Sequence, residues 1–373
     1  MNIAILGCSG SIGTTTLNII RKYSNDFNVV LLANDKNQDA LKKLGKEFKN
    51  ANLYSSSGFL KIDGNEVAFN PEYLFDSNSY ANVDIVVNGI SGIAGLKPSI
   101  ACIKAKKILV TANKESSVCG GNLLQKYIDE YKAEIRPIDS EHSTIWQCLE
   151  SPENVERIIL TASGGAFRDL DKESLSKAKA KDALKHPTWN MGKKVTIDCA
   201  TLMNKGMEII EAQRLFGIKE VAVLMHRESI IHSLVEMKDG MLIAGLSTPD
   251  MTIPIQYALS FPNRKETQVK KLDLEAIQSL NFGKINEELF PCLAICKKVS
   301  QYGDKAGTIM NAANEICVNE YLADAIGFYD IPRVITRCLD KFGLEGNFES
   351  LDELFKLDNE VREYAFALIK EGN

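Results

Sequence analysis

Apolar and polar positions alternate in the first third of the chain in a way that predicts a parallel sheet covered by helices. Four short apolar runs, at residues 3–6, 29–32, 85–87 and 108–110, are separated by amphipathic stretches with helical spacing. Strands that are apolar throughout are buried on both faces, as in a doubly wound sheet. We therefore expect an α/β fold that opens with a Rossmann-type domain over residues 1–138.

The rest of the chain predicts a second α/β domain, 139–262, and a helical end. The strand-like runs of this part occupy 157–162, 194–198, 221–225 and 241–247. A polar stretch then begins a linker over 263–288. At 311–342 and 351–370 apolar residues recur with the helical period, which predicts a small C-terminal helical domain over 289–373.

Composition narrows the class of protein. Of 373 residues 45% are apolar, and 44 basic against 49 acidic residues leave a net charge of −5, with both signs mixed along the chain. This balance argues against a nucleic-acid binder. No apolar run approaches the roughly 18 residues of a membrane helix, and no basic segment precedes the apolar start. We expect a cytoplasmic protein without membrane contact, whose nine cysteines form no CxxC pair, stay reduced and lie mostly in the core.

Three glycines follow the first predicted strand and open a helix. Gly7, Gly10 and Gly13 have the spacing GxxGxxG. At such a turn a pyrophosphate can approach bare backbone N–H groups at the positive end of a helix. The loop therefore predicts a nicotinamide dinucleotide cofactor, and a tight strand–helix turn without a ligand is the alternative.

The end of the second strand leaves the choice of dinucleotide open. In a Rossmann fold this position selects between a free ribose hydroxyl and a 2′-phosphate. Asp35 suits the free ribose of NAD, whereas Lys36, with the neutral Asn34 and Asn37, suits the extra phosphate of NADP. Lys36 is otherwise an ordinary surface lysine.

A polar cluster ends the strand at 108–110, on the edge where parallel sheets bind ligands. Asn113 can contact the nicotinamide ribose, and the charge of Lys114 can stabilise an enolate-like intermediate. Asn113 is also a good helix N-cap, so a capping role for this cluster is the alternative.

Two acidic segments predict a metal site. Asp139 and Glu141 point to one side of an extended chain, and Asn204 and Glu208 share a helix face at i,i+4. Three converging carboxylates suit a hard cation such as Mg²⁺ or Mn²⁺, with Co²⁺ as a third candidate. Acidic pairs on solvated faces are the alternative, and we interpret His142 as a structural hydrogen-bonding residue.

Between these segments lie groups that suit a phosphate. Ser163 and the two glycines after it offer a hydroxyl and free N–H groups, and His186, Asn204 and Lys205 add donors. Residues 163–193 then form a flap that closes over the ligand, with Trp189 and Met191 near its end. Trp189 could equally be a core residue. These donors predict a phosphorylated substrate.

Seven blocks of sequence, in order, resemble the 1-deoxy-D-xylulose 5-phosphate reductoisomerase family. They are GCSGSIG, TANKESSVCGG, PIDSEHSTIWQ, SGGAF, HPTWNMG, ATLMNKGMEIIEA and MNAANE. The resemblance implies NADPH- and metal-dependent conversion of 1-deoxy-D-xylulose 5-phosphate to 2-C-methyl-D-erythritol 4-phosphate, a step of the non-mevalonate isoprenoid pathway. It also implies a V-shaped homodimer and a phosphorylated sugar as substrate.

The resemblance also implies roles for the matching residues. Catalysis falls to Lys114 and to the metal ligands Asp139, Glu141 and Glu208. The substrate contacts are Lys114, Ser140, Glu141, Ser163, His186, Trp189, Met191, Cys199, Asn204, Lys205 and Glu208. The cofactor contacts are Gly7, Ser9, Gly10, Ser11, Ile12, Gly13, Asn34, Lys36, Asn37, Asn113, Glu115 and Gly192.

Two departures from the family pattern bear on these roles. Cys199 stands where the family usually has a serine that donates to the phosphate, and a thiol is a much weaker donor. Asn34 and Asp35 stand where the family more often has a small residue before the basic one.

Two other functions stay open as alternatives. An NADP-linked homoserine or semialdehyde dehydrogenase would share the glycine loop but needs no metal. A dinucleotide-sensing regulatory protein would bind cofactor without hydride transfer.

Overall fold

The computed structural model describes residues 1–62, 64–185, 187–189 and 191–371. The chain folds into two compact units, each assembled from segments that are distant in sequence. The first unit consists of residues 1–113, 124–143 and 250–269, and the second of residues 114–123, 144–249 and 270–373. The domain boundaries predicted at 138, 262 and 288 stay predictions.

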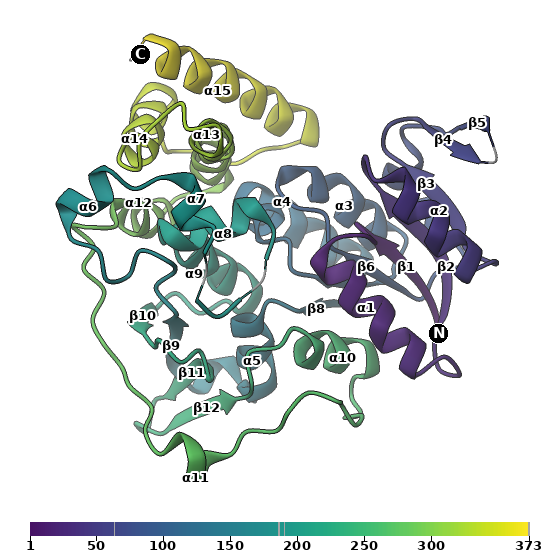
Figure 1. Cartoon of the computed structure of the whole chain (residues 1–373), viewed down its shortest axis with the longest axis horizontal. Helices are drawn as coiled ribbons and strands as arrows, with labels where there is room; N and C mark the ends of the chain where they lie inside the picture. The colour runs from purple at the N-terminus through teal and green to yellow at the C-terminus, as the bar shows by residue number, and fades with distance from the viewer. Residues whose placement is uncertain (63, 186, 190, 372–373) are drawn as a thin grey trace. The chain divides into compact units, whose positions relative to one another are not determined.

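A six-stranded parallel sheet forms the centre of the first unit (Figure 1). Its strands in spatial order are β3 (Asn52–Ser55), β2 (Asn28–Asn34), β1 (Asn2–Leu6), β6 (Ile85–Asn88), β7 (Ile108–Thr111) and β8 (Ile135–Pro137). The order reverses between β1 and β6, which is the point where doubly wound sheets bind ligands. The α/β fold class with an N-terminal Rossmann-type sheet is confirmed.

Amphipathic helices cover this sheet because its strands are apolar on both faces. Ile3, Ile5, Val86 and Val87 are fully buried. The helices of the first unit are α1 (Ser11–Lys22), α2 (Gln38–Glu47), α3 (Leu96–Lys104) and α10 (Thr252–Ser260), with the hairpin β4 (Phe59–Ile62) and β5 (Asn65–Ala68) and the short 3-10 helices η1 (Tyr73–Phe75), η2 (Ser77–Tyr80) and η3 (Ile93–Gly95). α10 packs on α1, although more than 200 residues of sequence separate them.

Two helices have residues in both units. α4 (Lys114–Tyr131) contains a kink at Gly120, where φ is −135° and ψ is 31°. Its first residues, including Lys114, belong to the second unit. α5 (Ser140–Cys148) begins in the first unit with the residues of the predicted metal site.

The second unit contains a mixed four-stranded sheet in the order β10-β9-β11-β12. β10 (Val221–Met225) runs parallel to β9 (Val155–Ala162), whereas β11 (Ile231–Met237) and β12 (Leu242–Leu246) add antiparallel strands. β9, β10 and β12 match predicted strands, and β11 is an addition. The short helices of this unit are η4 (Pro152–Asn154), α6 (Lys172–Ser176), α7 (Ala180–Ala183), α8 (Lys193–Ala200) and α11 (Leu274–Ile277).

Helices form the rest of the second unit. They are α9 (Met203–Phe216), α12 (Pro291–Val299), α13 (Asp304–Leu322), α14 (Asp330–Phe342) and α15 (Leu351–Glu371). α13 packs against both α14 and α15 (Figure 1). One apolar core joins this bundle to α9 and to the sheet, with Met203, Met310 and Val361 among its buried members. The helical end predicted from the sequence is confirmed.

One predicted strand is wrong. Residues 194–198 lie in α8 rather than in a sheet. Val195, Thr196 and Ile197 are β-branched, which favours strands. As a helix the segment buries Thr196 and Ile197 and places Lys194 and Asp198 one turn apart as an ion pair. Packing and charge pairing therefore override the local preference.

None of the nine cysteines forms a disulfide bond, and seven of them are buried, as small core residues are. Within the described residues, no helix combines the length and the apolar character that crossing a membrane requires.

Candidate active site

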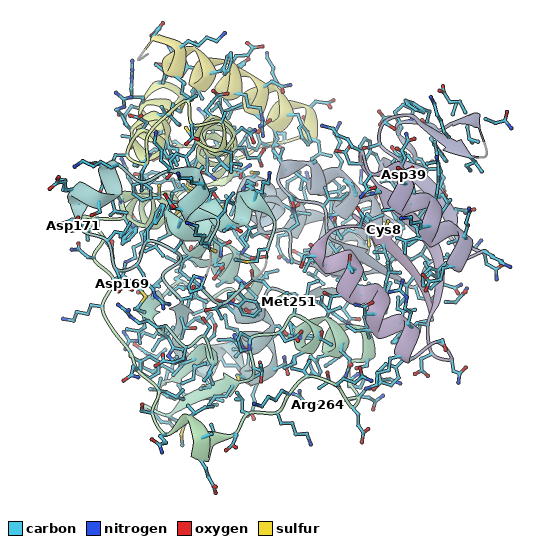
Figure 2. The ribbon with its side chains drawn as sticks, viewed as in Figure 1. Cys8, Asp39, Asp169, Asp171, Met251 and Arg264 are labelled. Atoms are coloured by element: carbon cyan, nitrogen blue, oxygen red, sulfur yellow. The ribbon has the colours of Figure 1, made fainter. Side chains whose placement is uncertain are left out.

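The glycine loop lies at the carboxyl end of β1, beside the loop that follows β6. Gly7 has a φ of +78°, and a Cβ on it would lie 2.8 Å from the carbonyl oxygen of Gly89. Only glycine fits such a left-handed position with backbone so near. Cys8 is buried in the same turn, at the end of β1 (Figure 2). The glycine brings two strand ends together at the point where the strand order reverses.

The first turn of α1 faces this loop with its backbone. Gly10 is the N-cap residue, and no side chain caps the helix start. The N–H groups of the first turn lack partners within the helix, and the helix dipole makes this end positive. Ser11, Ile12 and Gly13 thus present a surface that suits a pyrophosphate.

Polar residues at the end of β2 connect to the same loop. The Ser9 hydroxyl donates to Asn34 Oδ1 over 2.9 Å, and Asn34 Nδ2 donates to the carbonyl of Asn37 over 2.9 Å. The side chain of Asn37 caps α2 by accepting from the N–H of Ala40. These contacts place three of the predicted cofactor residues in one cluster.

Asp35 and Lys36 differ in their surroundings. The Asp35 carboxylate accepts a hydrogen bond from the hydroxyl of Ser56. The side chain of Lys36 is exposed. Both residues are exposed, and the acid also accepts a hydrogen bond from a neighbouring residue.

Asn113 supports the loop after β6. Its Nδ2 donates to the carbonyl oxygens of Ile90, over 2.7 Å, and Gly92, over 2.8 Å. The side chain is 3% exposed, and a Cβ on Gly95 would lie 2.7 Å from its Nδ2. The predicted cofactor contact is also a structural residue of the ligand edge of the sheet.

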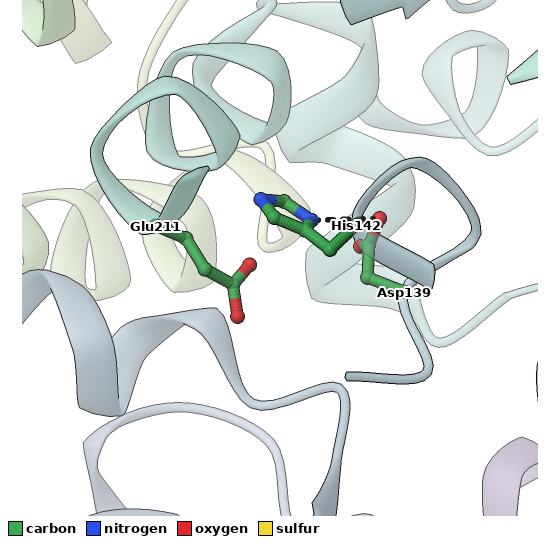
Figure 3. Close-up of side chains that lie close together, drawn as sticks. All are labelled: Asp139, His142 and Glu211. Carbon is green, nitrogen blue, oxygen red and sulfur yellow. Dashed lines mark ion pairs between the residues drawn. The ribbon is translucent and has the colours of Figure 1, made fainter. Parts of the chain in front are cut away.

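The acidic pair predicted to bind metal lies at the start of α5 in the first unit. Asp139 Oδ1 accepts from the N–H of Glu141 over 3.3 Å, and Ser140 Oγ donates to Glu141 Oε2 over 2.5 Å. Nδ1 of the fully buried His142 lies 3.3 Å from Asp139 Oδ1 (Figure 3). The imidazole of His142 thus lies directly beside a predicted metal ligand.

Four predicted residues meet on α9 and at the start of α4, all within the second unit. Lys114 Nζ donates to Asn204 Oδ1 over 2.7 Å and to Glu208 Oε1 over 3.2 Å. Asn204 Nδ2 and Lys205 Nζ also donate to the Glu208 carboxylate. We call these four residues the α9 cluster. Its side chains are buried, with Glu208 only 1% exposed. Two buried ammonium groups around one carboxylate leave the cluster with a net positive charge, which suits an anionic ligand.

A second buried ion group begins one residue further along the chain. Glu115, predicted as a cofactor contact, pairs with Lys194 over 2.8 Å, and Lys194 also pairs with Asp198 over 2.8 Å. Burial would raise the pKa of the Glu115 carboxyl, but the Lys194 ammonium outweighs this and lowers that pKa. Sequence reasoning missed Lys194 and Asp198, since 79 positions separate Lys194 from Glu115 and no motif joins them.

The Ser-Gly-Gly segment packs on the end of α8. Gly165 has a φ of +66°, and a Cβ there would lie 2.6 Å from the carbonyl oxygen of Cys199. The N–H of Gly165 donates to Ser163 Oγ over 3.4 Å. The structure therefore brings Ser163 and Cys199 to neighbouring segments, as a shared phosphate pocket requires. Burial raises the pKa of the Cys199 thiol, which keeps it neutral.

The predicted flap is described in part. Trp189 packs near His232 of β11, with ring centroids 6.2 Å apart. Met191 is half-buried and Gly192 is the N-cap residue of α8. His186, predicted to bind phosphate, lies outside the described residues. The contact between Trp189 and His232 was not predicted, because the sequence gives no signal for it.

Family models match three segments of the chain, which together cover most of it. Residues 3–121 match 1-deoxy-D-xylulose 5-phosphate reductoisomerase, residues 135–216 match the C-terminal domain of that enzyme, and residues 246–364 match the DXP reductoisomerase C-terminal domain. The family predicted from the seven sequence blocks is thus confirmed.

Curated relatives and solved structures agree with this match. The chain is 41% identical to the 1-deoxy-D-xylulose 5-phosphate reductoisomerase of Desulforamulus reducens, over 99% of this chain and 98% of that enzyme. It is 40% identical to the one of Clostridium tetani, over 97% and 98%. A crystal structure of DOX-P reductoisomerase with NADPH, fosmidomycin and magnesium superposes with a TM-score of 0.91 at 34% identity, covering 99% of this chain and 98% of that one. The Zymomonas mobilis enzyme with NADPH gives 0.85 at 31%, with the same coverage. The chain belongs to the 1-deoxy-D-xylulose 5-phosphate reductoisomerase family.

Proposed function

We propose that this chain converts 1-deoxy-D-xylulose 5-phosphate to 2-C-methyl-D-erythritol 4-phosphate, with NADPH and a divalent metal ion. The observation that carries the proposal is the α9 cluster, in a chain that aligns with a curated member of the family over 99% of its length. Buried lysines beside a buried carboxylate suit a substrate that brings both a phosphate and metal-binding oxygens.

The first unit holds the cofactor. The loop at Gly7 and the uncapped first turn of α1 bind the pyrophosphate by donating backbone N–H groups to it. Ser9, Asn34 and Asn37 line the adenosine side, and Asn113 supports the nicotinamide side. When bound, NADPH supplies the hydride for the reduction.

NADPH rather than NADH follows from the end of β2. The Asp35 carboxylate already accepts a hydrogen bond from Ser56, which leaves it fewer acceptor positions for a ribose hydroxyl. The exposed Lys36 offers its charge to a 2′-phosphate. A KM for NADH equal to or below that for NADPH would contradict this assignment.

Asp139, Glu141 and Glu208 are proposed as the metal ligands, with Mg²⁺ or Mn²⁺ as the ion and Co²⁺ as a third candidate. Their carboxylate oxygens are the ligands that hard cations prefer. Hydrogen bonds from Ser140 and Asn204 orient Glu141 and Glu208, as outer partners of metal ligands do. When bound, the ion acts as a Lewis acid on the substrate's oxygens.

The remaining residues bind and orient the substrate. Lys114 places its ammonium beside the reacting oxygens, where its charge stabilises developing negative charge. The phosphate is bound by Lys205, Asn204, Ser163 and His186. Cys199 adds a weak hydrogen-bond donor. Trp189 and Met191 close over the substrate, so binding of the non-reacting phosphate can be used to exclude water and align the reacting carbons.

The test follows the absorbance of NADPH with 1-deoxy-D-xylulose 5-phosphate, with and without Mg²⁺ or Mn²⁺. Wild type should oxidise NADPH only with metal. Glu208→Gln should lower turnover by roughly 100-fold or more, because it removes a ligand charge and the carboxylate that Lys114 and Lys205 both contact. The matched control is Glu220→Gln, which neutralises an exposed carboxylate of the same unit and should turn over as wild type does.

Turnover without metal would favour a homoserine or semialdehyde dehydrogenase. NADPH binding without turnover would favour the dinucleotide-sensing regulatory protein. Either result would contradict the proposed reaction.

The protein is further proposed to act as a cytoplasmic homodimer. Met241, Leu242 and Leu246, on and beside the edge strand β12, are 60%, 50% and 41% exposed, and a second copy along this edge would cover them. Cysteines that form no disulfide bond fit a reducing compartment. Light scattering that finds a monomer at micromolar concentration would contradict the dimer.

A further inference from the structure

Lys194 lies between two buried carboxylates of the second unit. Its Nζ is 2.8 Å from Glu115 Oε1 and 2.8 Å from Asp198 Oδ2. The side chains of Glu115 and Asp198 are 5% and 0% exposed, and that of Lys194 is 18% exposed. One ammonium therefore links the start of α4 to α8.

The MNAANE block, which has no role in the reaction described so far, completes this group. Asn314 of α13 donates from Nδ2 to Asp198 Oδ1 over 2.8 Å, and its side chain is fully buried. Both oxygens of Asp198 thus have donors, one from α8 and one from α13. The orientation of Asp198, and with it that of Lys194, depends on the helical bundle.

The bundle is fixed in turn by charged residues beside Asn314. Arg362 of α15 donates to Glu315 Oε2 over 2.6 Å and to Asp358 Oδ2 over 2.6 Å. Burial would lower the pKa of the Lys194 ammonium, but Asp198 and Glu115 raise it, with a further contribution from Glu315. Lys194 is therefore held charged, and buried and half-buried charges run from α15 through α13 and α8 to the start of α4.

The positions of these residues in the chain give the group its significance. Glu115 directly follows Lys114 of the α9 cluster, and Asp198 directly precedes Cys199. Without the ammonium of Lys194, Glu115 would lose this ion pair, while the charge of Lys114 would still act on it. A shift of Lys114 toward Glu115 would withdraw it from Asn204 and Glu208.

We propose that Lys194 is a positioning residue for the reductoisomerase reaction, held by Asn314 of the helical bundle. It orients Glu115, so that Lys114 stays with Glu208, and it orients Asp198, so that the Cys199 backbone stays beside Gly165. The inference rests on the proposed function and deepens it, because it assigns the C-terminal helices a part in the geometry of the site. A purely structural ion pair would stabilise the fold and leave the kinetic constants of the folded enzyme unchanged.

The test compares Lys194→Gln, which removes the charge, with Lys194→Arg, which keeps it. Full-length variants are measured for kcat, for KM of each substrate, for NADPH affinity by fluorescence without substrate, and for Tm. We expect kcat/KM of Lys194→Gln to fall roughly 10- to 100-fold, mostly through kcat, because small displacements of a catalytic group have effects of this size. Lys194→Arg should recover to within about fivefold of wild type. Lys297→Gln, which breaks an exposed ion pair of the same unit, should match wild type.

Wild-type kinetics in folded Lys194→Gln, or an arginine variant no better than the glutamine variant, would overturn the inference. If Lys194→Gln does not fold, Asn314→Leu serves in its place, with a kcat decrease of about threefold to tenfold expected. A lower Tm with unchanged kcat in that variant would overturn the inference. If wild type itself shows no turnover, the proposed function fails. NADPH affinity then still decides about Lys194, since a loss in Lys194→Gln supports its action on Glu115 and wild-type affinity contradicts it.

Discussion

The glycine loop of the first unit and the α9 cluster of the second are built in opposite ways. The loop offers backbone N–H groups, and its geometry depends on the absence of side chains at Gly7 and Gly13. The α9 cluster offers four buried side chains that hold one another. A backbone site is specified by residues next to one another in sequence. A side-chain site depends on distant segments, so it is sensitive to changes well outside its motifs.

This comparison predicts the largest effect for a methyl group in the loop. Gly7→Ala would place a Cβ 2.8 Å from the Gly89 carbonyl oxygen at a φ of +78°. We expect NADPH affinity to fall by roughly 100-fold or more and the free energy of unfolding to drop by about 2–4 kcal/mol, because strain and overlap add. Fluorescence titration with NADPH and urea denaturation measure the two effects.

Gly58→Ala is the matched control for this prediction. Gly58 has nearly the same φ, +80°, but a Cβ on it meets nothing within 4 Å. Gly58→Ala should lower the free energy of unfolding by only about 1–2 kcal/mol and leave NADPH affinity unchanged. Wild-type NADPH affinity in Gly7→Ala would show that the loop need not approach the cofactor closely.

A smaller, pH-dependent effect is expected from the buried charges. The folded-state pKa of Glu115 is lowered, since the Lys194 ammonium outweighs the opposing effect of burial. A lowered pKa gives stability that is present above the unfolded-state pKa and is lost as the pH falls through the folded-state value. Glu115→Gln should therefore lower the free energy of unfolding by about 1–3 kcal/mol at neutral pH. The difference in stability from wild type should shrink as the pH falls into the acid range.

Urea denaturation of both proteins over a pH series measures this difference. Glu47→Gln is the control, because the pKa of Glu47 is also lowered, by its hydrogen bond with Arg21, but this pair is exposed at the surface. It should change stability by less than about 1 kcal/mol at any pH. A pH-independent cost for Glu115→Gln would mean that packing, not charge, is what Glu115 contributes.

The same contrast explains what the sequence could predict. The Rossmann-type sheet was predicted because its apolar runs and the glycine loop are local signals. The helical end was predicted because its apolar residues keep the helical period over long segments. The segment 194–198 was misassigned because Val195 and Ile197 favour strands when taken alone. Its helical state depends on packing in the second unit.

The site was predictable to the extent that its residues lie in motifs. Lys114, Asn204, Lys205 and Glu208 were predicted, and they form one cluster. The sequence could not predict that Glu115 pairs with Lys194, nor that α13 supplies a hydrogen-bond donor to Asp198. Such pairings depend on how α4, α8 and α13 pack, and helical spacing carries no information about partners in other helices.

The smallest expected effect concerns the departure at Cys199. Burial raises the pKa of this thiol, so it stays a neutral, weak donor. A serine hydroxyl at the same position is a stronger donor to a phosphate oxygen. Cys199→Ser should therefore leave the KM for 1-deoxy-D-xylulose 5-phosphate unchanged or lower it by up to roughly fivefold. Cys148→Ser, the same exchange at a half-buried cysteine of the second unit, should leave that KM as it is. A clear rise in KM for Cys199→Ser would mean that the pocket uses the thiol as an apolar wall, with Lys205 and Asn204 carrying the phosphate without it.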